Sequence, residues 1–243
     1  MRAFLLFFLG ISLQGAAQTD TTYQYFDKDW KTTSKENAYF YAKIVKENKN
    51  WHRQDFWVNG NIMQMDAWYE DATTEVENGT ARFYTEKGIL RDSNNYSHGK
   101  LLSKYIFYED HSIKGFGIFN DEGDIIKQAG YEPNGKIIEG YIFQQEATFP
   151  GGIEAWQEYL IKSLNKNQPK AYKQGKINGT VVVTFLVDKE GNVNEVQLET
   201  SSGHTELDEH AMNIIRNSPK WNPAIQYNQK VIYRQKQSLT YSN

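Results

Sequence analysis

The residues best suited to chemistry gather in one stretch, Ser201–His210, where serine, histidine and acidic side chains follow closely. His204 and His210, with the carboxylates of residues 206–209, are the candidate metal ligands. Their spacing of six places the imidazoles on different faces of a helix, unlike the i, i+4 pair of zinc proteases. A serine near a histidine in sequence, as in SSGH, does not supply the triad geometry that activates a nucleophile. We therefore expect neither a metal site nor a catalytic residue here.

Two further motifs resemble ligand-binding loops only in part. The turn DKEGN has Gly191 at its fourth place, whereas a calcium loop needs glycine at the sixth. The GFG of residues 115–117 lacks the third glycine of a nucleotide loop. Because activated nucleophiles, carboxylate pairs and phosphate loops are all missing, we predict a protein that is not an enzyme and has no cofactor.

The first 17 residues predict a cleaved secretory signal peptide. Arg2 precedes an apolar run from Ala3 to Leu13, and small residues end at Ala17. The run is shorter than the roughly 20 residues that a spanning helix requires; a buried amphipathic helix is the alternative. No later stretch is apolar and long enough to span, so we expect an exported chain without a transmembrane anchor of its own. The net charge of −3 disfavours a nucleic-acid partner.

An aromatic residue recurs at nearly constant spacing between residues 56 and 147. Turn-forming clusters such as YTEKG and FNDEG follow most of these aromatics, and the residues between them alternate as in short strands. Such short units must stack on their neighbours to bury their aromatic faces. We predict an antiparallel meander of hairpins and assign residues 20–51 to it as well. The recurring residues, 11 or 12 apart, are Tyr84, Tyr96, Tyr108, Phe119, Tyr131 and Phe143.

This pattern resembles MORN-like repeats, in the form found in YwqK-type proteins. The resemblance implies an extended sheet that serves as a spacer or a binding face and carries no chemistry. Tyr84, Tyr96, Tyr105 and Tyr108 could form a sugar-stacking face, although cross-strand aromatic pairs more often hold a sheet together.

Beyond residue 147 the pattern predicts two helices. Ile153, Trp156, Leu160 and Leu164 lie on one side of a first helix. In the second, Thr205 and Asp208 have capping-box spacing, and Pro219 ends the helix. The apolar stripe expected along this second helix is Leu207, Ala211, Ile214 and Ile215.

Three strands accompany these helices. TVVVTFLVD and NVNEVQLETSS predict a hairpin around DKEGN. In the final segment Val231, Tyr233, Leu239 and Tyr241 alternate on one face. A minimal α+β domain results if both helices cover one side of the three strands. Trp221, fixed between two prolines, would then close one end of the core.

Four motifs in order resemble the C-terminal domain of TonB-type energy transducers, in the form common in the Bacteroidota. They are FPGG, G-x-VVVTFLVDKEGNV, LDEHA and PKWNPA, and they span 147–243. Two departures stand out: the place of a usual Tyr-Pro reads NQPKAY, and neither a membrane helix nor a proline-rich spacer is found. The force-transmitting role is thus left open. The residues that carry the resemblance are Phe149, Pro150, Gly151, Gly152, Gly191, Leu207, Asp208, Pro219, Lys220, Trp221 and Pro223.

The resemblance implies a periplasmic domain whose sheet edge pairs with a short extended peptide of an outer-membrane transporter. Free backbone groups on such an edge supply affinity, and side-chain pockets supply selectivity. Alternatively, Arg234 and Lys236 protect the edge from pairing. The candidate edge strand, carried over by position, is Val231, Ile232, Tyr233, Arg234, Gln235, Lys236, Gln237, Ser238, Leu239 and Thr240.

The predicted fold class is α+β, with a signal peptide at 1–17, a repeat region at 18–146 and a TonB C-terminal-like domain at 147–243. The predicted function is non-enzymatic binding of a transporter peptide or another envelope protein, linked to transmembrane transport, with a homodimer possible. The alternative is a structural module of the cell envelope whose repeat sheet binds a glycan or a protein.

Overall fold

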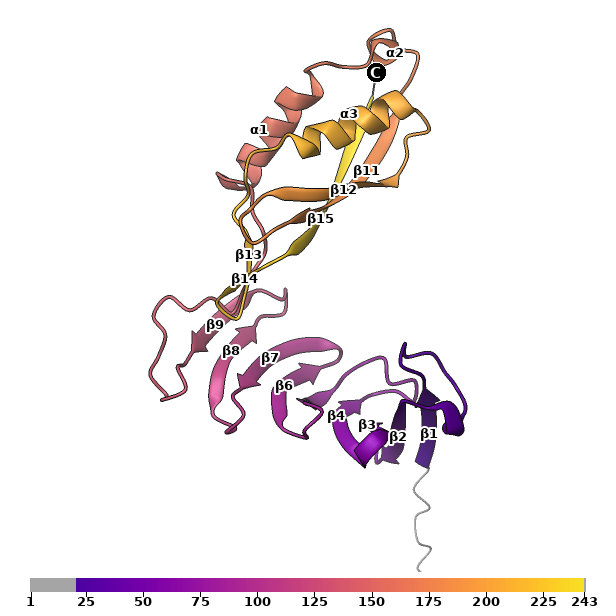
Figure 1. Cartoon of the computed structure of the whole chain (residues 1–243), viewed down its shortest axis with the longest axis vertical. Coiled ribbons are helices and arrows are strands. Elements are labelled where there is room, and N and C mark those ends of the chain that lie inside the picture. The colour runs from indigo at the N-terminus through magenta and orange to yellow at the C-terminus, as the bar shows by residue number, and fades with distance from the viewer. Residues whose placement is uncertain (1–20, 243) are drawn as a thin grey trace, which may run out of the picture. The chain divides into compact units, whose positions relative to one another are not determined.

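The computed structural model describes residues 21–242, so the predicted signal peptide lies outside the described residues. Nine strands, β1 to β9, form a sheet in which spatial order follows sequence order, and a smaller region of helices and strands comes after them (Figure 1). The α+β class is thereby confirmed. The chain forms two compact units, up to Leu101 and from Leu102 onward.

The first unit contains six antiparallel strands joined by short turns. The aromatic-rich N-terminal segment is part of this sheet, as its composition predicted. Phe40, Ala42 and Ile44 alternate on the buried face of one strand. Ala67 and Ala81 are buried beneath larger neighbours, because a methyl group leaves space for the adjacent rings. The strands are β1 (Thr21–Phe26), β2 (Phe40–Glu47), β3 (Asn50–Trp57), β4 (Ile62–Tyr69), β5 (Gly79–Tyr84) and β6 (Leu90–Ser97), with 3₁₀ turns η1 (Lys35–Asn37) and η2 (Asn59–Asn61).

The meander closes with β7 (Lys100–Phe107), β8 (Ile113–Phe119) and β9 (Ile125–Gly130). The predicted repeat strands end there, and Phe143 is not a strand residue of this sheet. Its buried ring occupies space that a side chain at Gly117 would take, since a Cβ there would lie 2.7 Å from Cδ1 of Phe143. Tyr141 fills the corresponding space at Gly130. The assignment of Phe143 to the repeat was therefore wrong, because equal spacing does not distinguish a strand residue from a side chain that packs onto the sheet from outside it.

The remaining elements have the predicted order of helix, hairpin, helix and strand. The sheet order is β12-β11-β15, and α3 lies across β11 and β12 while contacting α1 (Figure 1). A short helix and a second small sheet, of order β10-β13-β14, were not predicted. The elements are β10 (Gln144–Gln145), α1 (Gly152–Leu164), α2 (Lys170–Lys173), β11 (Gly179–Val187), β12 (Val193–Thr200), α3 (Thr205–Arg216), β13 (Ala224–Gln226), β14 (Gln229–Val231) and β15 (Tyr233–Tyr241).

One core joins both helices to the inner face of this sheet. Alternate residues of β11, from Val181 to Val187, are fully buried, and the predicted stripe of α3 is buried throughout. In α1, Trp156 and Leu160 are buried as predicted. Ile153 was also predicted to face the core, but it lies in the first turn of α1 and is 60% exposed.

The predicted capping box of α3 is not formed. The N-cap residue is His204, without a side-chain cap, and Thr205 is the first helical residue. Asp208 instead accepts hydrogen bonds from the hydroxyl of Ser201 and from the amide and hydroxyl of Ser202. Burial alone would raise the pKa of Asp208, but these hydrogen bonds outweigh it and hold the pKa below its usual value. The carboxylate therefore fixes the segment before the helix.

Trp221 occupies the predicted place at the end of the core and is 7% exposed. Its ring meets Trp156 and Phe185 edge to face, with centroids 4.9 and 5.5 Å away. Its backbone N–H donates to the carbonyl of Gly191, in the turn between β11 and β12. The connector between α3 and the last strand is thus packed from two sides.

Candidate functional site

The last strand of the C-terminal region forms one edge of its sheet. β15 pairs with β11 along its entire length, from Tyr233 opposite Val187 to Tyr241 opposite Gly179. Among the described residues no strand pairs with its other flank. An edge strand of this kind offers unpaired N–H and C=O groups to a further strand.

The boundaries of this strand differ from the predicted Val231–Thr240. Val231 belongs to β14, where it pairs with Ala224, and Ile232 lies outside the strands and is exposed. The cause is a hairpin whose two turn residues, Tyr227 and Asn228, have φ of 53° and 62°. Asparagine tolerates this left-handed region. Asn228, between two short alternating runs, was therefore the sequence signal for a hairpin at this place. The edge strand is therefore Tyr233–Tyr241.

The side chains of β15 alternate between two environments. Leu239 and Tyr241 face the core and are buried, whereas Tyr233 on the same face is half-buried. The opposite face is exposed along its length and carries two cations and two hydroxyl groups. These exposed residues are Arg234, Lys236, Ser238 and Thr240.

Two glutamines interrupt the core-facing row and connect β15 to its surroundings. Gln237 Oε1 accepts a hydrogen bond of 2.8 Å from the indole Nε1–H of Trp156. Gln235 Nε2 donates to the carbonyl of Ala147 at 3.2 Å. Gln237 Nε2 also donates to the carbonyl of Ser238 at 2.7 Å. The inner face of the edge strand is thus held by both α1 and the segment that precedes it.

A hollow of about 270 Å³ adjoins this part of β15. Gln235, Lys236 and Gln237 line one side, and Phe149 and Ile153 are among the apolar residues of the other. Sequence reasoning missed this hollow, although glutamines at core-facing positions were a signal that the core is open there. Ile153 lines this open hollow, which accounts for its exposure.

The FPGG segment that carried part of the resemblance begins α1. Gly151 and Gly152 have φ of 89° and 80°, a left-handed conformation that favours glycine. Phe149 is buried against Trp156 and Trp221. The other residues that carried the resemblance are outside the core: Pro150, Pro219 and Lys220 are exposed, and Pro223 is half-buried. Their contribution is therefore to the backbone conformation and not to core packing.

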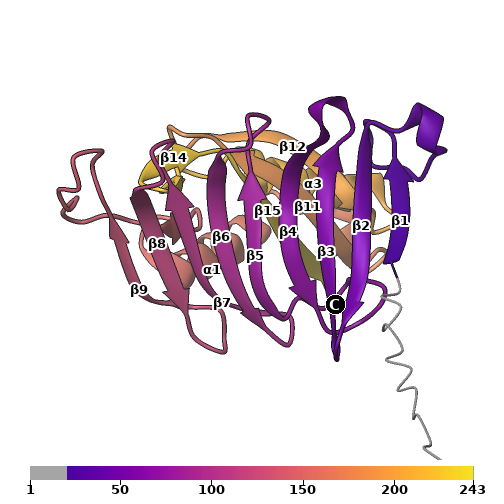
Figure 2. The ribbon, with the colours of Figure 1, turned by 90° about the horizontal axis from the view of Figure 1, so that it is seen from below.

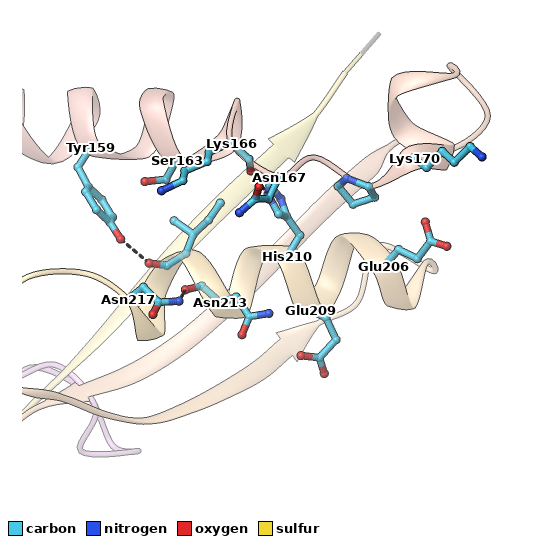
Figure 3. Close-up of a pocket in the computed structure, with 12 residues that line it drawn as sticks. Tyr159, Ser163, Lys166, Asn167, Lys170, Glu206, Glu209, His210, Asn213 and Asn217 are labelled. Carbon is cyan, nitrogen blue, oxygen red and sulfur yellow. Dashed lines mark hydrogen bonds between the residues drawn. The ribbon is translucent and has the colours of Figure 1, made fainter.

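A second hollow, of about 910 Å³, lies between α1 and α3 (Figure 3). Tyr159 points from α1 toward α3 and donates to the carbonyl of Ile214 at 2.7 Å (Figure 3). His210 uses both ring nitrogens, one with the carbonyl of Lys166 at 2.9 Å and one with the hydroxyl of Tyr241 at 2.8 Å. The histidine thus links α3 to the segment after α1 and to the end of β15.

The tyrosines proposed for sugar stacking have separate local contacts. Tyr105 stacks on Phe116 with centroids 5.4 Å apart. The hydroxyl of Tyr108 donates to the carbonyl of Tyr131 at 2.8 Å, and that of Tyr96 accepts from Asn94 at 3.0 Å. Tyr84 lines a hollow in the first unit.

Residues 165–242 match the family model of the Gram-negative bacterial TonB protein C-terminal domain. The matched part contains α2, the β11–β12 hairpin, α3 and the edge strand β15, which supports the resemblance found from the motifs. Comparison with curated proteins gives no significant match for the chain. Within residues 21–242 no helix has the length and apolar character needed to cross a membrane. The match indicates a domain of the TonB C-terminal type within this part of the chain.

Proposed function

We propose that the C-terminal region, residues 147–243, works in the periplasm by capturing an extended peptide of an outer-membrane transporter, which adds as a strand beside β15. The observation that carries this proposal is the unpaired flank of β15. The family match supports it, because it places the edge strand inside a domain of the TonB C-terminal type.

The two faces of β15 suggest how such a peptide would be selected. Main-chain hydrogen bonds along the edge are independent of sequence and contribute about 0.5–1.5 kcal/mol each. Side chains of the added strand would alternate between the two faces of the sheet. On the outer face they would meet Arg234 and Lys236, which favour acidic partners. On the inner face they would reach the hollow beside Phe149 and Ile153, which favours an apolar side chain.

The contacts of Gln237 suggest which backbone groups are available. Its side-chain amide donates to the carbonyl of Ser238, as expected for a carbonyl that points away from β11. In an antiparallel ladder, alternate residues direct both their N–H and C=O groups to the same neighbour. We therefore expect Lys236, Ser238 and Thr240 to present their backbone groups to the unpaired flank.

Lys236→Pro should weaken peptide binding at least about tenfold, because it removes one N–H from the unpaired flank and obstructs the approach of the peptide backbone. The matched control, Lys236→Ala, keeps the N–H and loses only the exposed ammonium group, which pairs with Glu199. Since exposed ion pairs contribute about 0–1 kcal/mol, Lys236→Ala should bind within a few-fold of the unsubstituted chain. Fluorescence anisotropy with labelled peptides from the periplasm-facing segments of outer-membrane transporters measures both effects.

Equal affinity of Lys236→Pro and Lys236→Ala would contradict strand addition at this edge. Thermal unfolding of both variants serves as a check, since proline at an outward-facing position of an edge strand should be tolerated. If the cations instead protect the edge, the unsubstituted chain would bind none of the peptides. Replacing Arg234 and Lys236 by alanine would then promote self-association.

A further inference from the structure

One end of the sheet in the first unit carries three connections side by side. They join β1 to β2 (residues 27–39), β3 to β4 (58–61) and β5 to β6 (85–89). In an antiparallel meander every second turn lies at the same end of the sheet, and these three do so (Figure 2). The peptide site proposed at β15 does not involve these three loops.

Large side chains are exposed at this end. Trp30 is 44% exposed and Tyr39 is 53% exposed, both in the β1–β2 connection. Val58, in the β3–β4 connection, is also exposed. Exposed apolar side chains are normal when they are scattered singly, whereas a group of them marks a contact surface. Two exposed aromatic rings on one connection, with an exposed valine on the next, therefore point to a ligand.

Two hollows of about 300 and 230 Å³ open at this end, and Trp57 lines both. Each has aromatic walls and a few polar groups, the usual composition of a ligand site. Both volumes lie at or below the lower limit of about 300–1,000 Å³ for sites of drug-sized ligands, so each suits a single ring. The first is lined by Ala38, Tyr39, Trp57, Val58, Asn59, Ile62 and Glu86, and the second by Trp30, Asp55, Trp57, Gln64, Met65, Phe83, Tyr84 and Arg91.

Trp30 is held in place before any ligand arrives. Its φ of 60° is left-handed, which is an outlier for so bulky a residue. The turn is fixed by Asp27, whose carbonyl accepts from the N–H of Trp30 at 3.1 Å and whose carboxylate accepts from the N–H of Lys31 at 3.0 Å. One face of the indole stacks on Phe40, with centroids 4.3 Å apart and the rings 12° from parallel. A strained position that presents a half-exposed aromatic ring is typical of a binding site.

The charges lining the second hollow are already paired. The Asp55 carboxylate is buried and accepts from Nε of Arg53 at 2.8 Å. Nε of Arg91 donates to the carboxylate of Asp92 at 2.6 Å, while its guanidinium lies over the ring of Phe83 at 5.9 Å. An ionic ligand would have to compete with these internal pairs, whereas a neutral polar ligand would not.

The loops around the hollows are also balanced in charge. Residues 27–37, DKDWKTTSKEN, contain three acidic and three basic side chains, and Glu86 is followed by Lys87. Binding to an anionic membrane or a polyanion requires an excess of lysine and arginine. The occupant that fits aromatic walls, unionised polar groups and a balanced rim is therefore neutral, ring-shaped and rich in hydroxyl groups.

We propose that this end of the first unit binds a neutral glycan, with one pyranose ring seated in the hollow beside Trp30 and Trp57. The apolar C–H face of the sugar would pack on an indole, because aromatic rings combine large apolar area with a defined plane. Its hydroxyl groups would bond to polar groups of the lining such as the Gln64 amide. The first hollow, beside Tyr39, would take the next ring of the glycan chain. This activity is separate from peptide capture at β15.

Saturation-transfer NMR on the full chain tests this proposal, with chitotetraose, maltotetraose and laminaritetraose as neutral probes. We expect at least one probe to bind with a Kd of about 1 mM or tighter. Trp30→Ala should weaken that binding at least about tenfold, because the stacking surface is lost. Tyr23→Ala is the matched control, since Tyr23 is a 51% exposed ring of the same unit that lines neither hollow; it should leave the Kd unchanged.

Failure of all three probes to bind at about 10 mM would overturn the glycan site, as would equal affinity of Trp30→Ala and the unsubstituted chain. Sedimentation with vesicles of phosphatidylethanolamine and phosphatidylglycerol provides a second arm. Vesicle binding that disappears in Trp30→Ala would assign the loops to a membrane surface and overturn the proposal. Tyr39→Ala, in the other hollow, is a second variant that keeps the test decisive if Trp30→Ala fails to fold; it too should weaken binding.

Discussion

Trp221→Ala should lower the free energy of unfolding of the C-terminal region by about 3–5 kcal/mol, the usual cost of removing a large buried aromatic side chain. The ring is 7% exposed and contacts Phe149, Trp156 and Phe185 edge to face. Its loss would leave a cavity bounded by these three rings, two of which belong to α1 and β11. Urea unfolding followed by circular dichroism at 222 nm measures the change, because α1 and α3 lie in this region.

Two variants make that measurement specific. Trp221→Phe should cost clearly less, since it retains an aromatic ring in the same cavity. Trp30→Ala removes a tryptophan that is half-exposed in the other unit, so it should leave this transition unchanged. A loss below about 1 kcal/mol for Trp221→Ala would show that the ring does not close the core.

Gly191→Ala should have the second large effect, because two costs act at one position. The φ of Gly191 is 85°, which costs an L-residue about 1–2 kcal/mol. A Cβ would in addition overlap the carbonyl oxygen of Trp221. Relief of this overlap requires the Trp221 backbone to move, and the hydrogen bond from its N–H to the Gly191 carbonyl would be strained. We expect a loss of roughly 3 kcal/mol or more in thermal or urea unfolding.

Gly123→Ala separates these two costs. Gly123 occupies the same place in a similar turn, with a φ of 89° and an N–H that donates to the carbonyl of Asn120. Nothing lies within 4 Å of a Cβ there. Gly123→Ala should therefore show only the conformational cost of about 1–2 kcal/mol. Equal losses for the two variants would mean that the turn does not press on Trp221.

Features governed by local pattern were predictable from the sequence. The alternation of β-branched residues identified β11, and the apolar spacing identified α3, because both elements bury one face against the same core. Trp221 between Pro219 and Pro223 was also correctly placed, since the prolines restrict the connector. Recurring aromatics with turn clusters correctly predicted a meander of strands. The MORN-like identity of these repeats and the 146/147 boundary remain predictions.

Features that depend on distant contacts were not predictable. Phe143 has the spacing of a repeat residue, yet its place is decided by the missing side chain at Gly117. Asp208 has capping-box spacing, but its carboxylate accepts hydrogen bonds from the hydroxyl groups of Ser201 and Ser202, and α3 has no side-chain cap. The hollow beside β15 arises where α1, the preceding segment and the edge strand meet, and none of these shows it alone.

Hydrogen exchange of backbone amides, read by NMR on the labelled full chain, tests strand addition most directly. With a saturating transporter peptide, we expect the amides of Lys236, Ser238 and Thr240 to become protected while the other sheet edge, β12, exchanges as before. Protection confined to residues 21–130, or equal exchange along β15 with and without bound peptide, would contradict capture at this edge.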